Sequence, residues 1–203
     1  MNSITVSAME KWKADLEALL AAEDHPALLR LSRDAPARTL RYLSGRLYSE
    51  DADVKWRAVR ALGALAADPA LLTDEKLSEL LRRYLWSFND ESGAVPFGVA
   101  EAIGEILARR PSLQEAFLPV ICSMTHEEEA VQTGPIERGI IWAIGRVGVP
   151  ALRCDPDVLP RMRSMAAAHP DPETRRVAAW ALHRLEGGEE GPCPRATERQ
   201  SSG

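Results

Sequence analysis

Apolar positions recur with a helical spacing in four segments of the chain. Each segment opens with a residue that caps helices by accepting a backbone N–H bond: Asp51, Ser92, Thr133 and Asp171. Apolar or small residues follow at i, i+3, i+4 and i+7, which places them on one face of a helix. We therefore expect four amphipathic helices that begin near residues 51, 92, 133 and 171, with spacings of 41, 41 and 38 residues.

The four segments align as an internal repeat. Glycine occupies the same position in three of them (Gly63, Gly104 and Gly145), where the missing side chain would let two helices approach closely. No segment alternates at period two, so the sequence predicts an all-α fold without a sheet. Further helices are predicted over residues 8–22, 25–33, 36–49, 73–88, 112–125 and 155–169.

Residues 51–65 and 171–185 carry a resemblance to a known family. The second of these ranges reads Asp-Pro-Glu-x-Arg-x-x-Ala-x-x-Ala-Leu, and both resemble HEAT-like repeats, especially the short bacterial type of phycobilisome lyases. The resemblance implies an all-α, right-handed α-α superhelix (an ARM-type solenoid) of about five helix pairs. We expect an N-terminal helical cap over 1–35, repeats over 36–186 and a disordered tail over 187–203.

A second stripe on the repeated helices carries aromatic and charged side chains. At about 100° per residue it lies roughly 150° from the apolar stripe, so we expect it to face outward. Trp and Arg are enriched in binding hot spots, which favours a partner-binding Trp/Arg ribbon. The alternative is a ladder between repeats, in which Arg60–Glu101 and Glu105–Arg146 pair and the indoles cover neighbouring helices. The members of the stripe are Trp56, Arg60, Phe97, Glu101, Glu105, Arg138, Trp142, Arg146, Arg176, Trp180 and Arg184.

The junction over residues 86–105 departs most from a plain repeat. Trp86 is followed by Asn89, Asp90 and Glu91, and no basic residue occurs between Asn89 and Glu105. Such a group of carboxylates could bind a cation, or supply a general base if crowding raises one pKa. Alternatively, Asn89 and Ser92 serve only as turn and cap residues.

Composition and charge narrow the function classes. The chain has 203 residues, 45% of them hydrophobic, and a net charge of −5, which excludes wholesale disorder and argues against nucleic-acid and membrane-surface binding. No membrane span or secretory signal is expected, and three scattered cysteines favour a reducing cytoplasm.

Tryptophan is over-represented, with five Trp against three Phe and three Tyr. One basic cluster stands near the N-terminus: Arg30, Arg33, Arg38, Arg41 and Arg46.

No motif for nucleophilic, metal or cofactor chemistry is found, so we expect no catalytic residues, no metal and no cofactor. The His-Glu pairs of HEAT-like hydroxylases are replaced here, for example by Trp56-Arg57. The sequence therefore predicts a non-catalytic cytoplasmic scaffold or adaptor that holds a protein partner, with its oligomeric state left open. The alternative is an enzyme or enzyme subunit with a carboxylate-lined concave site. A lyase-type activity is one form of it; another is a HEAT-like DNA glycosylase, whose Trp-then-Asp arrangement Trp86 and Asp90 resemble.

Overall fold

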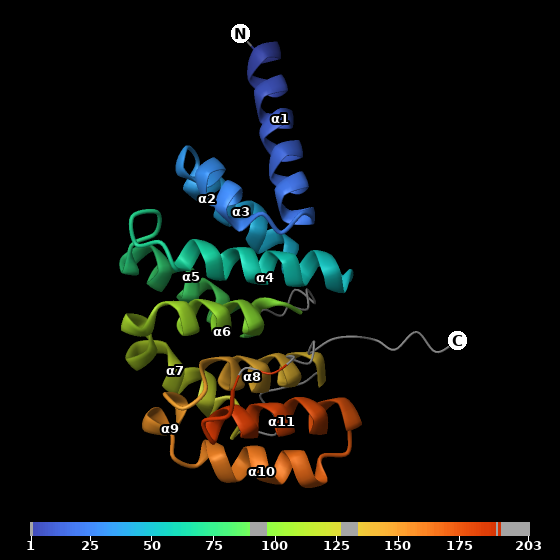
Figure 1. Ribbon diagram of the computed structural model, residues 1–203, viewed down its shortest axis with the longest axis vertical. Coiled ribbons are helices and arrows are strands. Elements are labelled where there is room, and N and C mark those ends of the chain that lie inside the picture. Colours follow the sequence, from blue (N-terminus) through green and yellow to red (C-terminus); the bar gives the residue numbers. More distant parts are fainter. Residues whose placement is uncertain (1, 90–96, 127–133, 190, 192–203) are drawn as a thin grey trace, which may run out of the picture.

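The computed structural model describes residues 2–89, 97–126, 134–189 and 191, and the secondary structure in these ranges is helical, without a strand (Figure 1). The all-helical prediction is thus confirmed. The α-helices are α1 (Asn2–Ala21), α2 (His25–Arg33), α3 (Pro36–Arg46), α4 (Ala52–Ala66), α5 (Asp74–Trp86), α6 (Val99–Arg109), α7 (Gln114–Ser123), α8 (Gly134–Val147), α9 (Ala151–Cys154), α10 (Val158–Ala168) and α11 (Pro172–Leu185).

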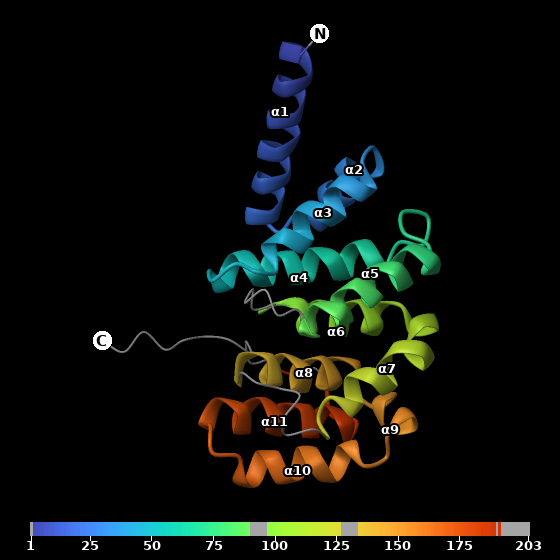
Figure 2. The same ribbon diagram turned by 180° about the vertical axis from the view of Figure 1, so that it is seen from behind.

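The repeated helices form one layer of a stack. Helix α4 packs against α6, α6 against α8, and α8 against α11 (Figures 1 and 2). The helices between them in sequence form a second layer, with α5 on α6, α7 on α8 and α10 on α11. Helices α2 and α3 pack on α4, and α1 projects from that end of the stack.

The predicted caps at two of the four repeats are confirmed. The carboxylate of Asp51 accepts hydrogen bonds from the backbone N–H of Asp53 and Val54, at 2.8 and 3.2 Å. Asp171 caps α11 in the same way through the N–H of Thr174, at 3.0 Å. The other two predicted caps, Ser92 and Thr133, lie outside the described residues. Helix α6 has Gly98 at its N-cap position, so its described part begins later than residue 92.

Two of the aligned glycines allow helices to touch. A Cβ atom on Gly104 would lie 2.6 Å from the Cα of Ala143, and one on Gly145 would lie 2.8 Å from the Cα of Ala181. Atoms of neighbouring backbones do not approach so closely, so these contacts of α6 with α8 and of α8 with α11 require glycine.

The helix expected over residues 155–169 begins three residues later in the structure. Helix α9 ends at Cys154, and α10 begins only at Val158. Asp155, between them, is extended (φ −150°, ψ 100°). This conformation is the one favoured for a residue before proline, because the ring of Pro156 clashes with a helical neighbour. The prediction was wrong here because it placed the helix start ahead of Pro156.

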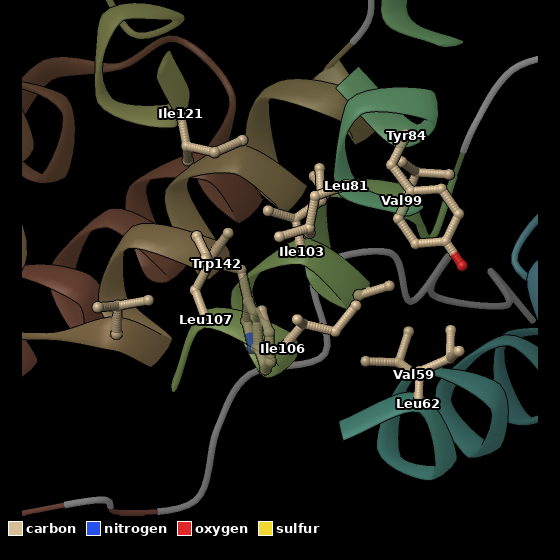
Figure 3. Close-up of a cluster of buried hydrophobic side chains, with 14 of the residues drawn as sticks. Val59, Leu62, Leu81, Tyr84, Val99, Ile103, Ile106, Leu107, Ile121 and Trp142 are labelled. Carbon is tan, nitrogen blue, oxygen red and sulfur yellow. The ribbon is translucent and has the colours of Figure 1, made fainter. Parts of the chain in front are cut away.

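The hydrophobic core runs through the stack. Val99, Ile103 and Ile106 of α6 lie between side chains of α4 and α5 (Figure 3). Buried side chains form one connected cluster from Leu16 in α1 to Leu185 in α11. Burial of this apolar surface holds the repeated helices in the order that positions the residues described next.

Candidate functional site

Most of the Trp/Arg stripe lies inside the stack. The exposed fractions are 4% for Trp56, 1% for Glu101, 8% for Glu105 and 3% for Trp142, so the prediction that the stripe faces outward is wrong for these residues. Helix α6 has α4 and α8 on its sides and α5 and α7 against it, and every residue from Val99 to Leu107 is buried. The single-helix projection counted only one buried face. Of the seven remaining predicted members, Arg176 is exposed. The other six are partly buried: Arg60, Phe97, Arg138, Arg146, Trp180 and Arg184.

Three indoles touch one another across the layer, and we call Trp56, Trp142 and Trp180 the tryptophan row. The rings of Trp56 and Trp142 are 5.0 Å apart between centroids at an interplanar angle of 64°. The rings of Trp142 and Trp180 are stacked, 5.9 Å apart at 12°. Such pairs contribute about 0.5–1.5 kcal/mol beyond their buried area. The row therefore joins α4, α8 and α11, as the ladder alternative anticipated.

Two buried residues of opposite formal charge, Lys55 and Glu101, lie beside the row. Lys55 is 2% exposed, with its Nζ 5.8 Å from the ring centroid of Trp56, and Glu101 is 1% exposed. Neither carboxylate oxygen of Glu101 accepts a hydrogen bond from the described part of the chain. Burial raises the pKa of Glu101 to about 7, although the charges of Lys55 and Arg138 oppose the shift. Burial likewise lowers the pKa of Lys55, against the charge of Glu101.

Glycines make room for both side chains. A Cβ atom on Gly98 would lie 2.6 Å from the Cγ of Lys55, and one on Gly139 would lie 2.8 Å from Oε2 of Glu101. Because any larger residue at these two positions would displace the buried side chains, the placement of Lys55 and Glu101 depends on these glycines. We did not expect this role for Lys55 from the sequence.

One of the two predicted ladder pairs forms. Arg146 donates through Nε and Nη2 to the carboxylate of Glu105, at 2.7 and 3.3 Å, and both side chains are about nine-tenths buried. Arg60 instead donates to Glu23, at 2.6 and 3.1 Å, so the predicted Arg60–Glu101 pair is wrong. The turn after α1 supplies a nearer carboxylate, which a comparison of repeats could not include.

The other charged members of the stripe are also engaged. Arg138 donates to Asp171 at 2.7 Å, and Arg176 donates to Glu173 at 2.7 Å. Partial burial would raise the pKa of Asp171, but hydrogen bonds from Thr174 and Arg138 lower it to about 2. Arg138 therefore joins α8 to the N-cap of α11, whereas the pair of Arg176 and Glu173 lies within α11.

The junction after α5 carries a highly exposed aromatic side chain. Trp86, the last residue of α5, is 76% exposed. Asn89 ends the short 3₁₀ turn η1 (Ser87–Asn89), whereas Asp90 and Glu91 lie outside the described residues. The other two acids predicted for this cluster face different partners: Glu101 lies near Lys55, and Glu105 pairs with Arg146.

A groove of about 540 Å³ lies between α3 and α5. A hydrogen bond of 2.7 Å between the hydroxyls of Ser44 and Tyr84 joins the two helices at the groove. We call it the basic groove, because three of its lining residues are the exposed cations Arg41, Lys76 and Arg83 and one is the acid Glu79. The rest of its lining is Pro36, Ala37, Leu40, Ser44, Gly45, Tyr48, Leu72 and Tyr84.

Trp86 extends the groove side of α5. It follows Glu79 by seven residues, nearly two turns, so the two side chains project from the same side of the helix. Sequence reasoning singled out Trp86 and the arginines of residues 30–46, but it did not predict that Arg41 and the helix ending at Trp86 line the same groove. The overlooked signal is Gly45, a glycine inside a helix that no repeat alignment accounts for.

The described ranges contain no group of three or more His, Cys, Asp or Glu side chains that could hold a metal ion. None of the helices described is both long and apolar enough to cross a membrane. Comparison with protein-family models and with curated proteins gave no match to this chain, so the resemblance to HEAT-like repeats rests on the residues quoted above.

Proposed function

We propose that this protein is a non-catalytic scaffold of the HEAT-like repeat type that holds another protein. The resemblance of residues 51–65 and 171–185 to such repeats supports this, as does the layered packing of α4, α6, α8 and α11. In this proposal the helix pairs continue as a right-handed superhelix. Repeat solenoids stack units that contact only their neighbours and so present long surfaces to partners.

One observation carries the proposal: Trp86 is 76% exposed at the end of α5, the helix that forms one wall of the basic groove. A large indole in water is unfavourable, and Trp is the residue type most enriched in binding hot spots. Two indoles of the tryptophan row are buried and the third, Trp180, is partly buried. We therefore assign to the row the positioning of helices and move the binding surface to the side of α3 and α5. Binding of a protein at this surface needs only complementary shape and charge, and no catalytic group.

The test is affinity capture from a lysate of the source organism, with the full chain and two variants as bait. Trp86→Ala removes the exposed indole, and Val149→Ala is the matched control, since Val149 is 48% exposed between α8 and α9. We expect proteins that wild type and Val149→Ala retain and Trp86→Ala loses. Identical captured proteins for all three baits would contradict the site, and background binding alone would contradict the scaffold function.

A second candidate function is catalytic, and one observation favours it. The carboxyl of Glu101 is buried without a hydrogen-bond partner among the described residues, and its pKa of about 7 is typical of a general base. We place it second because Glu101 is 1% exposed, which keeps a substrate away from the carboxyl. For the glycosylase form, the measurement is base release from alkylated DNA, and activity that Glu101→Gln abolishes would favour this candidate.

A further inference from the structure

We propose that the basic groove binds a short acidic segment of a partner protein that also carries a large apolar side chain. The inference rests on the scaffold function proposed above and names the chemistry of its partner. Three kinds of observation carry it: the charges at the groove, its apolar lining, and the space in front of Gly45.

The charges at the groove favour an anionic segment. Arg41, Lys76 and Arg83 are exposed, and none of them forms a salt bridge with a described residue. Glu79 is the one acid among the lining residues, so the groove has an excess of two positive charges within a protein of net charge −5. An acidic peptide therefore gains attraction at this surface, while the rest of the protein repels it.

The apolar residues of the lining favour a ligand that carries an apolar side chain. Leu40 is half-buried, Tyr48 is 38% exposed, and Leu72 lies at the groove with 1% exposed. Together with the indole of Trp86, these side chains offer a place for an aliphatic or aromatic residue that a purely electrostatic ligand would leave in water. This favours a protein segment over a nucleic acid or a lipid headgroup, whose charged phosphates would gain nothing from the apolar lining.

Gly45 gives the groove an open wall. A Cβ atom on Gly45 would meet no atom of the protein within 4 Å. Its φ is not positive, so neither internal packing nor backbone conformation requires glycine there. A glycine inside a helix costs up to about 1 kcal/mol relative to alanine. The groove is therefore open in front of this position, and a side chain as large as an indole placed there would occupy the space that a partner segment needs.

The length of the groove sets the size of the segment. From Pro36 to Tyr48 the wall spans twelve residue steps. At about 1.5 Å per residue over α3 and the turn that continues it, that is ~18 Å of wall. An extended peptide covers that distance with about six residues.

The experiment is an unbiased selection on the chain of 203 residues. A displayed library of random peptides about twelve residues long, roughly twice the extended span, is panned on wild type and counter-selected on Gly45→Trp. The added indole fills the groove without contacting the protein's own atoms at its Cβ, and Gly45→Ala serves as the matched control. We expect selected peptides that are rich in Asp and Glu, carry at least one large apolar residue, and bind Gly45→Ala as they bind wild type.

Fluorescence anisotropy with one selected peptide then tests the two chemistries. The double variant Arg41→Glu/Arg83→Glu should weaken binding about tenfold or more, and added salt should weaken wild-type binding. Replacement of the peptide's apolar residue by Ser should also weaken it. The proposal is overturned if selected peptides show no excess of acids, if Gly45→Trp binds them normally, or if a single-stranded DNA or an anionic vesicle binds the groove better than the peptide.

Failure of this inference can be told from failure of the proposed function. If lysate capture depends on Trp86 but not on Arg41, Gly45 or Arg83, the scaffold function stands and the acidic-partner inference falls. If Trp86→Ala changes nothing and no peptide is selected, both fall.

Discussion

The tryptophan row and the basic groove are built from similar side chains, but they have opposite surroundings. In the row, Trp56 and Trp142 are 4% and 3% exposed, and the neighbouring Glu105 and Arg146 pair with each other. At the groove, Trp86 is 76% exposed and Arg83 is paired with no described residue. The same residue types therefore serve cohesion between helices in one region and are available to a partner in the other.

The comparison shows that Trp and Arg on a repeated helix do not by themselves identify a binding surface. A helix in the middle of a stack has neighbours on both sides, so a long side chain that points away from the main core still reaches the next repeat. Trp86, in contrast, is the last residue of α5 and is 76% exposed.

Removal of the central indole should have the largest effect. We expect Trp142→Ala to lower the free energy of unfolding by about 3–5 kcal/mol, because it leaves a cavity between α4, α8 and α11. Urea denaturation followed by circular dichroism measures this. Trp142→Phe should lose clearly less, and a loss below 1 kcal/mol for the alanine variant, well under the usual cost for a buried Trp, would show that the row does not hold the stack.

The buried carboxyl of Glu101 should make stability fall as pH rises. Its pKa of about 7 lies above the value of 4.5 for an unperturbed Glu, so between these pH values the folded state binds the proton more tightly. The stabilisation is complete below pH 4.5 and is lost as pH passes 7, by up to about 3 kcal/mol at 1.36 kcal/mol per pKa unit. If the free energy of unfolding depended on pH in the same way for wild type and Glu101→Gln, the assignment of this pH dependence to Glu101 would be wrong.

Two glycine-to-alanine variants, one in the interior and one at the groove, should change the stability in opposite directions. Gly104→Ala should destabilise by about 1–3 kcal/mol, since its Cβ would lie 2.6 Å from the backbone of Ala143. Gly45→Ala has open space and should stabilise by about 0.4–1 kcal/mol. Thermal unfolding of both proteins checks the opposite signs. Equal shifts would mean that the close approach of α6 and α8 tolerates a methyl group.

The smallest effect is expected at the exposed indole. Trp86→Ala should change the free energy of unfolding by no more than about 0.5 kcal/mol, because little of this side chain is packed. The same urea titrations measure it beside Trp142→Ala. A large loss would mean that Trp86 supports the fold, and its loss of binding could then no longer be assigned to a partner contact.

The sequence predicted the helices and their caps better than it predicted the candidate site. Asp51 and Asp171 were predicted as caps because capping is a local contact, and Gly104 and Gly145 were placed at close approaches because they align between repeats. The Glu105–Arg146 pair followed from the same alignment. The exposure of Trp142 could not be predicted, because it depends on helices on both sides of α8.

The sequence by itself determined the helices of this protein and the order in which they repeat, since apolar spacing, caps and prolines act within a few residues. The tertiary structure decided which side chains are covered. It brought Glu23 to Arg60, placed Lys55 against Gly98, and opened a groove between α3 and α5. Burial is a property of surfaces that meet from distant parts of the chain. The large number of tryptophans could therefore be read from the sequence, but not the division of those tryptophans between interior and surface.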